Sequence, residues 1–309
     1  MHYIVRDAIL VLILDLFSVI LQNYSELVCD NALIVWIFDL GGGTVEFSFI
    51  SSKENKLIKS VRKLMSSARE RKTTGTFVLE GLRLCADAAQ NGYSVDTLIV
   101  SEALENSDRL KAIVSVAKQC VKVPESLFSY MCDTVSPQGV MCVVKIPETV
   151  GNIAEISRGK YIVLENTADP ANLGTISRTA EALGLSGLII SSNGCDPFSP
   201  KAQRAGMGAL LRLPIYLTNN LIDDLLMLKT KGFCTYASVV SNAECDVTKV
   251  DYPENCAVLI GNEANGLTPE AIAACEKLVT ITMRGRAESL NAAAAASIIM
   301  WEMVRKEVL

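Results

Sequence analysis

Two short loops near the C-terminal end of the chain combine glycine with polar side chains. The first, residues 261–267, reads Gly-Asn-Glu-Ala-Asn-Gly-Leu and follows the apolar segment 256–260. The second, residues 288–291, reads Glu-Ser-Leu-Asn and follows the apolar segment 278–282. We expect both segments to be strands, and each loop to lead into a helix. Because ligands bind at the carboxyl ends of the strands in an open α/β sheet, both loops are predicted to contact a ligand.

A third polar stretch lies upstream, where residues 172–178 read Asn-Leu-Gly-Thr-Ile-Ser-Arg. We expect Asn172 and Arg178 to lie on adjoining faces at the start of one helix. Taken singly, each stretch also has a plain structural explanation: a helix cap with an exposed arginine, a tight turn, or the cap of a final helix. Short motifs recur by chance, so a function is inferred only from the three together, in this order and on these elements.

The histidine and cysteine content excludes several kinds of site. The only histidine is His2, which leaves no basis for histidine acid/base catalysis or a His-rich metal site. The ten cysteines form no CxxC pair, so neither a zinc site nor a secreted disulfide framework is indicated. They are typical of small core residues in a reducing compartment, and we expect a cytoplasmic protein that holds no metal.

Length and the order of the apolar segments predict two main α/β domains. With 309 residues and ~150 residues per domain, the chain suits about two. We assign residues 51–150 to the first, residues 151–309 to the second, and residues 1–50 to an atypical extension. In the second domain, expected strands alternate with expected helices, which predicts a mostly parallel sheet covered on both faces. The strands are expected at 161–164, 187–191, 213–217, 234–239, 256–260 and 279–282, and the helices at 172–183, 200–211, 220–229, from 269, and at 291–306.

The first domain begins with a basic segment in an otherwise acidic protein. Residues 51–85 carry nine basic and three acidic residues, whereas the whole chain has a formal charge of −5. Leu57, Val61 and Leu64 recur at helical spacing, which predicts an amphipathic helix with a basic outer face. A charge run is usually a solvated helix face, but these cations could also bind RNA phosphates. The candidate RNA-binding residues are Lys53, Lys56, Lys59, Arg62, Lys63, Arg69, Arg71 and Lys72. We expect a strand at 77–80, a helix at 81–89, a strand at 97–100, a helix at 110–119 and a strand at 139–144.

The extension contains two segments of its own. Residues 8–21 are apolar but interrupted by Asp15, and they are shorter than the ~20 residues of a membrane span. A buried helix or strand is therefore expected, without membrane contact. Residues 37–46, Ile-Phe-Asp-Leu-Gly-Gly-Gly-Thr-Val-Glu, are a plausible phosphate cradle and resemble the second phosphate loop of heat-shock chaperone ATPases. The other segments of that fold are missing, so a β-hairpin or an appended fragment is the preferred interpretation.

Together, the three polar stretches resemble the motifs of the SpoU (TrmH-type) branch of the SPOUT RNA methyltransferases. The basic segment, with 75–81 reading Gly-Thr-Phe-Val-Leu-Glu-Gly, is similar to the ribosomal-protein-like substrate-binding domain that precedes many of these enzymes. The resemblance implies a SPOUT domain whose last helix passes through a loop as a trefoil knot. It also implies a homodimer, formed through the C-terminal domain, in which parts of each site are shared between chains.

The resemblance further implies methyl transfer from S-adenosylmethionine to a ribose 2′-hydroxyl of RNA. Ribosomal RNA is favoured over transfer RNA because the basic front domain is typical of that branch. Base methylation by another SPOUT branch is disfavoured by the Ser-Leu-Asn loop. A catalytically inactive RNA-binding or ribosome-assembly factor remains as an alternative, and a chaperone-like ATPase is the last one.

By the same resemblance, the cofactor pocket is lined by Ile260, Gly261, Ile281, Met283 and Leu290. The residues expected to do chemistry or to orient the reactants are Arg178, Glu263, Ser289, Asn291 and Asn172. A guanidinium has a pKa above ~12 and stays protonated, so we expect Arg178 to stabilise the developing alkoxide or to hold a phosphate rather than act as a base. Two positions depart from the family pattern: Thr282 stands where proline is usual, and Ala292 where valine is common.

Overall fold

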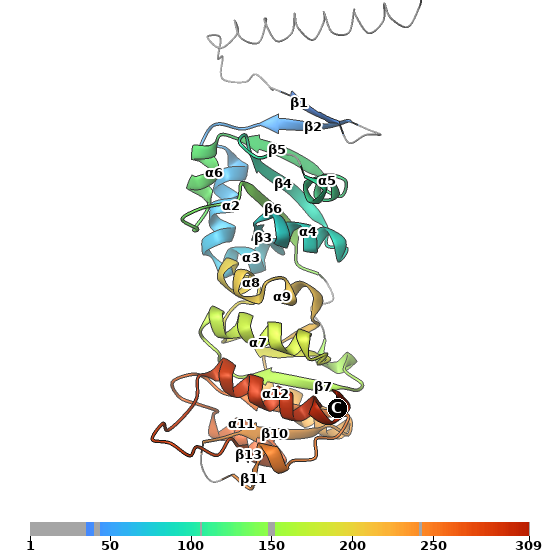
Figure 1. Ribbon diagram of the computed structural model, residues 1–309, viewed down its shortest axis with the longest axis vertical. Helices are drawn as coiled ribbons and strands as arrows, with labels where there is room; N and C mark the ends of the chain where they lie inside the picture. The colour runs from blue at the N-terminus through green and yellow to red at the C-terminus, as the bar shows by residue number, and fades with distance from the viewer. Residues whose placement is uncertain (1–34, 40–43, 106, 148–151, 241–242, 309) are drawn as a thin grey trace, which may run out of the picture.

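The computed structural model describes residues 35–39, 44–105, 107–147, 152–240 and 243–308. The expected apolar element at 8–21 and the glycines at 41–43 lie outside these ranges. Two β-sheets lie one above the other along the long axis of the molecule (Figure 1). Within the described residues, no helix is both long enough and apolar enough to cross a membrane.

The first sheet has six strands in the order β1-β2-β5-β4-β6-β3. Strands β1 (Val35–Asp39) and β2 (Thr44–Phe49) form an antiparallel hairpin, which confirms the hairpin expected around the glycine turn. Strand β2 also pairs in parallel with β5, so this sheet begins ahead of the boundary expected at residue 51. The remaining strands are β3 (Thr76–Glu80), β4 (Val95–Ser101), β5 (Gln119–Val123) and β6 (Val140–Lys145).

Five helices accompany the first sheet in the described residues: α2 (Lys56–Ser66), α3 (Ala68–Thr74), α4 (Leu82–Gln90), α5 (Asp108–Val114) and α6 (Glu125–Met131). Helix α2 is amphipathic as predicted, with Ile58, Val61 and Leu64 buried. The helix expected at 110–119 is wrong in its second half. Helix α5 ends at Val114, and the chain then forms β5, which lies between β2 and β4 in the sheet. Val121 of β5 is fully buried. We call residues 44–147 the front module.

The second sheet has seven strands in the order β11-β13-β10-β12-β7-β8-β9, and all of its pairs are parallel. Its strands are β7 (Lys160–Leu164), β8 (Gly187–Ser191), β9 (Ile215–Thr218), β10 (Cys234–Ser238), β11 (Cys245–Asp246), β12 (Cys256–Ile260) and β13 (Lys277–Thr280). The predicted parallel α/β sheet is therefore confirmed. From β7 the chain proceeds outward through β8 and β9 and then crosses to β10 and β12 on the other side. The strand order reverses between β7 and β12, which is where ligands bind in open α/β sheets.

The helices of residues 152–308, which we call the C-terminal module, are η1 (Ile153–Glu155), α7 (Pro170–Ala182), α8 (Pro200–Gly206), α9 (Ala209–Arg212), α10 (Leu221–Thr230), η2 (Val247–Lys249), α11 (Pro269–Ala274) and α12 (Ala292–Val308). The single helix expected at 200–211 is split into α8 and α9. Met207 and Gly208 both have positive φ angles, 51° and 89°, and these end one helix before the next begins. Helices α7 and α12 lie next to each other in front of the sheet (Figure 1).

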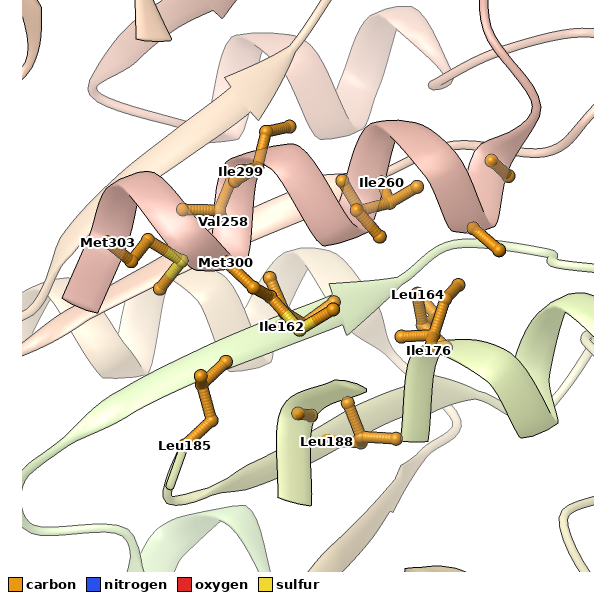
Figure 2. Packing of buried hydrophobic residues seen from close by; sticks show 14 of the residues in the cluster. Ile162, Leu164, Ile176, Leu185, Leu188, Val258, Ile260, Ile299, Met300 and Met303 are labelled. Carbon is orange, nitrogen blue, oxygen red and sulfur yellow. The ribbon is translucent and has the colours of Figure 1, made fainter. Parts of the chain in front are cut away.

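The largest core cluster joins α12 to the centre of the second sheet. Figure 2 shows Ile299, Met300 and Met303 of α12 gathered with Ile162 of β7 and Val258 of β12, and all five are buried. Each such side chain contributes about 1.5–3 kcal/mol when it is fully buried. This packing fixes the start of α12 beside the carboxyl ends of β7 and β12. The passage of α12 through a loop, and the domain boundaries at 51 and 151, stay predictions.

Candidate active site

The loops after β7 and β12 meet where the strand order reverses. Leu164 and Ile260 are partners in the last register of these two strands. Just beyond them, the N–H of Glu165 donates to the carbonyl oxygen of Ile260 at 3.0 Å. The side-chain amide of Asn262 donates to the carbonyl oxygen of Asn166 at 2.7 Å. The two loops therefore form one connected edge.

The Glu263 carboxylate lies at the N-terminal end of α7. It accepts hydrogen bonds from the backbone N–H groups of Ala168 at 3.1 Å and Asp169 at 3.3 Å, and from the side-chain amide of Asn172 at 2.8 Å. Partial burial raises the pKa of Glu263, but these three donors and the backbone N–H of Glu263 itself together outweigh it and hold the pKa below its ordinary value. A helix N-terminus also favours negative charge. Glu263 is thus a fixed, ionised group that ties the β12 loop to α7.

The third loop joins the same cluster through Asn291. Its side-chain Nδ2 donates to Oδ1 of Asn172 at 3.0 Å. Its Oδ1 accepts from the backbone N–H groups of Ala293 at 2.9 Å and Ala294 at 3.3 Å, so that Asn291 caps α12. A continuous chain of hydrogen bonds, Glu263–Asn172–Asn291, therefore connects all three predicted motifs.

Gly261 is required by a close approach of backbone within the β12 loop. A methyl group at this position would lie 2.3 Å from the carbonyl carbon of Gly266 and 2.4 Å from the nitrogen of Leu267. Asn262 and Gly266 exchange two backbone hydrogen bonds, of 3.0 and 2.9 Å, and these close the loop. Only glycine leaves room for this turn, so the packing of the loop itself explains why position 261 is glycine.

The residues expected to line a cofactor pocket differ in how much they expose. Ile260 is buried in the core, so only its backbone can face a ligand. Gly261, Ile281 and Met283 are half-buried, and Leu290 is exposed. Apolar side chains and the backbone groups of the Gly261 turn suit a small organic cofactor better than a metal ion, which prefers carboxylate, imidazole or thiolate ligands. Among the residues that the structure describes, no group of His, Cys, Asp and Glu is arranged to hold a metal.

Arg178 and Ser289 stay outside the hydrogen-bonded chain. Arg178 is exposed on α7, and its guanidinium forms no hydrogen bond or ion pair with any residue in the described ranges. It comes six residues after Asn172, about one and two-thirds helical turns, and therefore faces a direction about 120° away. Ser289 is also exposed, in the loop before α12. The structure thus brings Glu263, Asn172 and Asn291 together within one chain and leaves these two residues at the surface.

Seven of the eight candidate RNA-binding cations are exposed. They are Lys53, Lys56, Lys59, Arg62, Lys63, Arg69 and Lys72. Lys59 forms an ion pair with Glu54. Lys53 and Arg62 lie over the ring of Tyr130, at 4.6 and 4.7 Å from its centroid, an arrangement typical of cation–π contacts.

Arg71 does not belong to this exposed set. Only 4% of its surface is exposed, and its Nε donates to Oδ2 of Asp196 at 2.7 Å. Its Nη1 donates to the carbonyl oxygen of Leu64. Because α3 turns this side chain inward, Arg71 cannot contact RNA in this structure, and its prediction as an RNA-binding residue is corrected.

Sequence reasoning missed Glu165, which follows β7 directly. The residue is 5% exposed, and its carboxylate accepts from the N–H of Thr268 at 2.8 Å and from the hydroxyl of Thr268 at 2.6 Å. Thr268 is the N-cap of α11, the helix expected from residue 269. An acidic residue at the end of an apolar strand was the signal that could have revealed it.

Sequence reasoning also missed Asp246. This residue accepts hydrogen bonds from Thr282, which stands where proline is usual in the family. Its Oδ2 accepts from the N–H of Thr282 at 3.1 Å and from the hydroxyl of Thr282 at 2.5 Å. Its Oδ1 accepts from the N–H of Thr248 at 3.0 Å and from the hydroxyl of Thr248 at 2.6 Å. Proline has neither a backbone N–H nor a hydroxyl, so it could not make these two bonds at position 282. In this chain the Asp246 carboxylate holds the segment after β13 instead.

Comparisons with known proteins match both modules. The family described as "SpoU rRNA Methylase family" matches residues 159–301, and the one described as "MRM3-like substrate binding domain" matches residues 55–142. The 23S rRNA (guanosine(2553)-2'-O)-methyltransferase RlmP of Bacillus subtilis is 28% identical over 82% of this chain and 98% of its own length. The 23S rRNA (uridine(2479)-2'-O)-methyltransferase of Streptomyces viridochromogenes is also 28% identical, over 83% of this chain and 92% of its own length.

Two solved structures share the fold over most of the chain. The SpoU methyltransferase AviRb of Streptomyces viridochromogenes, in complex with AdoMet, has a TM-score of 0.76 at 26% identity and covers 82% of this chain and 99% of its own. The AdoMet-bound rRNA methyltransferase of Sinorhizobium meliloti has a TM-score of 0.75 at 30% identity and covers 84% of this chain and 97% of its own. The motif geometry and these matches lead to one conclusion: the chain belongs to the SpoU rRNA methylase family.

Proposed function

We propose that the protein transfers the methyl group of S-adenosylmethionine to a ribose 2′-hydroxyl of ribosomal RNA. The observation that carries this proposal is the hydrogen-bonded chain Glu263–Asn172–Asn291, which joins the three motif loops at the reversal of strand order. Two relatives that match over most of their length are named as 23S rRNA 2'-O-methyltransferases. Two similar structures contain AdoMet.

The cofactor would lie against the Gly261 turn and the segment from Ile281 to Leu290. When bound, S-adenosylmethionine supplies a methyl group on a cationic sulfonium. The chain then has two tasks: to align the hydroxyl with the methyl group, and to make loss of the hydroxyl proton easier. The Glu263–Asn172–Asn291 chain serves the first task, because it fixes both cofactor loops relative to α7.

Arg178 would serve the second task. Arginine supplies a positive charge with several planar donors, and such a charge near the ribose stabilises the developing alkoxide or holds the adjacent phosphate. Within one chain Arg178 points away from Asn172 and has no partner in the described residues. We therefore propose that Arg178 acts at the site of a second copy of the chain in a homodimer.

The exposed face of α12 supports such a homodimer. Ala294, Ile298 and Trp301 recur at helical spacing and are all exposed, with Ile298 at 39% and Trp301 at 41%. Helix α12 packs directly against α7, which carries Arg178. A second copy seated on this apolar stripe would remove it from water and come close to α7.

Ribosomal RNA would be held by the front module. The seven exposed cations, from Lys53 to Lys72, would contact phosphates and so position the RNA without reading its sequence. We propose that the chain divides near residues 51 and 151 into an extension, an RNA-binding domain and a methyltransferase domain, and that β1 and β2 of the extension continue the sheet of the RNA-binding domain past β5. This substrate class would place the protein in the cytoplasm.

The test is incubation with tritiated S-adenosylmethionine and unmodified transcripts of 23S rRNA, 16S rRNA and transfer RNA. We expect incorporation into 23S rRNA, at one ribose that resists alkaline cleavage. Incorporation into transfer RNA alone would assign the other RNA class. If calorimetry finds no S-adenosylmethionine binding and no RNA is labelled, the chain is an RNA-binding factor without this activity. Arg178→Lys, which keeps the charge but loses the planar donors, is the matched negative control.

A further inference from the structure

The front and C-terminal modules are joined by a partly buried ion pair. Arg71 of α3 and Asp196, in the loop after β8, are in contact at 2.7 Å, and the two side chains are 5% and 23% exposed. The second donor group of Arg71 is taken up by the carbonyl oxygen of Leu64, at the end of α2. A guanidinium held at both ends in this way has little freedom, and it links the α2–α3 corner to the C-terminal module.

Next to this pair, the C-terminal module inserts an aromatic ring into the core of the front module. Phe198 is 4% exposed, and its ring centroid lies 5.1 Å from that of Phe77 of β3. It belongs to the same buried cluster as Leu79 and Val144 of the first sheet. The Oδ1 of Asp196 accepts from the N–H of Phe198 at 2.8 Å. Asp196 therefore holds both the ion pair and the ring.

A second ion pair lies at the same junction. Arg204 of α8 and Glu80 of β3 are 3.4 Å apart, and the Glu80 side chain is buried. The hydroxyl of Thr134 also donates to Glu80. We name Arg71, Phe77 and Glu80 of the front module, together with Asp196, Phe198 and Arg204 of the C-terminal module, the inter-module latch.

The latch lies on a short, tightly packed path between the RNA-binding face and the motif loops. Helix α3 carries the exposed Arg69 and Lys72 on one side and the buried Arg71 on the other. Helix α8 lies directly below α3 in Figure 1 and packs against α7, which carries Asn172. The two helices approach so closely that a methyl group at Gly174 would lie 2.3 Å from Cβ of Ala205. Helix α8 also packs against β3, which in turn contacts α3. Strand β3 and helices α8 and α7 thus pack in sequence with little room to slide.

We infer that the inter-module latch sets the distance between the bound RNA and the cofactor, so that Arg71 and Asp196 are positioning residues that determine which ribose is methylated. Two modules joined by a linker move relative to each other by default, unless a substantial apolar interface holds them. Here two partly buried ion pairs and an inserted ring fix the orientation. Phosphate contacts on the front module carry no sequence information, so a fixed span to the cofactor is a physical means of selecting one ribose. This inference rests on the proposed function.

The test uses the full chain with the neutral pair Arg71→Met and Asp196→Asn. Removing one partner of a buried ion pair leaves an unpaired charge, whereas replacing both with neutral residues of similar size is often close to neutral for stability. Asn at position 196 can still accept from the N–H of Phe198. The measurements are the melting temperature, the Kd for S-adenosylmethionine, the Kd for unmodified 23S rRNA transcript, the single-turnover rate, and the methylated positions.

We expect the melting temperature and both dissociation constants to stay near those of the wild-type protein. The single-turnover rate should fall about 10- to 100-fold, because a small misplacement of reacting groups has effects of this size. Methylation should also spread to neighbouring riboses. Arg71→Lys, which keeps the charge but cannot reach both Asp196 and Leu64, should show the same loss in part. It carries the test if the neutral pair fails to fold.

A matched control is Arg69→Ala, two residues away on the exposed side of α3. It should weaken RNA binding and lower its salt dependence, and methylation should stay at a single ribose. If the folded latch variants methylate the wild-type ribose at the wild-type rate, the positioning role of the latch is overturned. A wild-type protein that methylates none of the RNAs is a different outcome, because it overturns the proposed function itself.

Discussion

The side-chain amides of Asn172 and Asn291, 119 residues apart in the sequence, are joined by a hydrogen bond of 3.0 Å. Asn172 is 6% exposed and uses both ends of its amide: its oxygen accepts from Asn291, and its nitrogen donates to Glu263. Because the two ends have different partners, the orientation of this amide is fixed. One buried side chain therefore sets the relative position of the loops that would hold the cofactor.

Replacing Asn172 should uncouple these loops. In Asn172→Ala, the Glu263 carboxylate and the Asn291 amide each lose a partner, at a cost of about 1–3 kcal/mol. We expect the affinity for S-adenosylmethionine, measured by calorimetry, to fall about tenfold. Asn172→Asp should be worse, because it places a second carboxylate against Glu263. Thr175→Ala, at an exposed position one turn along α7, is the control. Unchanged affinity in Asn172→Ala would show that the loops hold their positions without it.

Gly261→Ala should damage the cofactor loop specifically. The added methyl group would lie 2.3 Å from the backbone of Gly266, so the loop must open. We expect S-adenosylmethionine binding to be abolished. The free energy of unfolding should fall by about 1–3 kcal/mol, the usual cost of overpacking. Gly232→Ala, in the turn after α10, is the control: it strains a backbone with a φ of 84° but adds a methyl group that meets no atom within 4 Å, so it should lower stability and leave S-adenosylmethionine binding unchanged. Binding that survives in Gly261→Ala would mean that this turn does not shape the pocket.

Arg178→Lys should separate chemistry from binding. The exposed guanidinium forms no hydrogen bond or ion pair in the described part of the chain, so its replacement should leave both stability and S-adenosylmethionine affinity unchanged. The turnover number should fall about 10²- to 10³-fold, the usual effect of removing one donor to a developing oxyanion. Arg109→Lys, on the exposed side of α5, should have no effect. Turnover near that of the wild-type protein would refute both proposed roles of Arg178.

Asp246 should make stability depend on pH in the acid range. Hydrogen bonds from the hydroxyl groups of Thr248 and Thr282, and from their backbone N–H groups, hold the pKa of Asp246 well below its ordinary value. Its stabilising contribution is therefore fully present above about pH 4, the pKa of an unfolded aspartate, and is lost as the pH falls toward the folded pKa. We expect Asp246→Asn to lower the free energy of unfolding at pH 7, and the difference from the wild-type protein to shrink below about pH 4. Thr282→Val, which removes one donor, should show a smaller effect. A difference that stays constant down to pH 2 would contradict this role.

The salt dependence of RNA binding should show whether the basic face of α2 and α3 contacts RNA. Replacing Lys56, Lys63 and Lys72 with glutamine should weaken binding to 23S rRNA transcript. It should also lower the slope of log K against log salt by about 0.7–0.9 for each RNA phosphate that the variant no longer neutralises. The S-adenosylmethionine affinity should not change. Lys111→Gln, on α5, is the control for a general change of charge. An unchanged slope in the triple variant would show that RNA binds to another face of the protein.

Local sequence signals were reliable where one residue decides one feature. Thr268 and Pro269 mark the start of α11, and the structure begins that helix at Pro269. The spacing of Val61 and Leu64 correctly identified the buried side of α2. The sequence signals failed where the secondary structure of a segment depends on the elements packed beside it. The residues of β5 follow a short helix without a clear break, and they form a strand because β2 and β4 pair with both of its edges.

The sequence by itself determined the parallel α/β character of the C-terminal module, the three motif loops and the family. Strand ends, glycine turns and helix caps are local features, and they leave a local pattern. Only the tertiary structure decided that Asn172 joins Glu263 to Asn291, that Arg71 faces Asp196 rather than solvent, and that Asp246 holds Thr282. Each of these contacts links residues far apart in the chain, and whether a polar side chain meets water or a partner depends on which elements pack beside it.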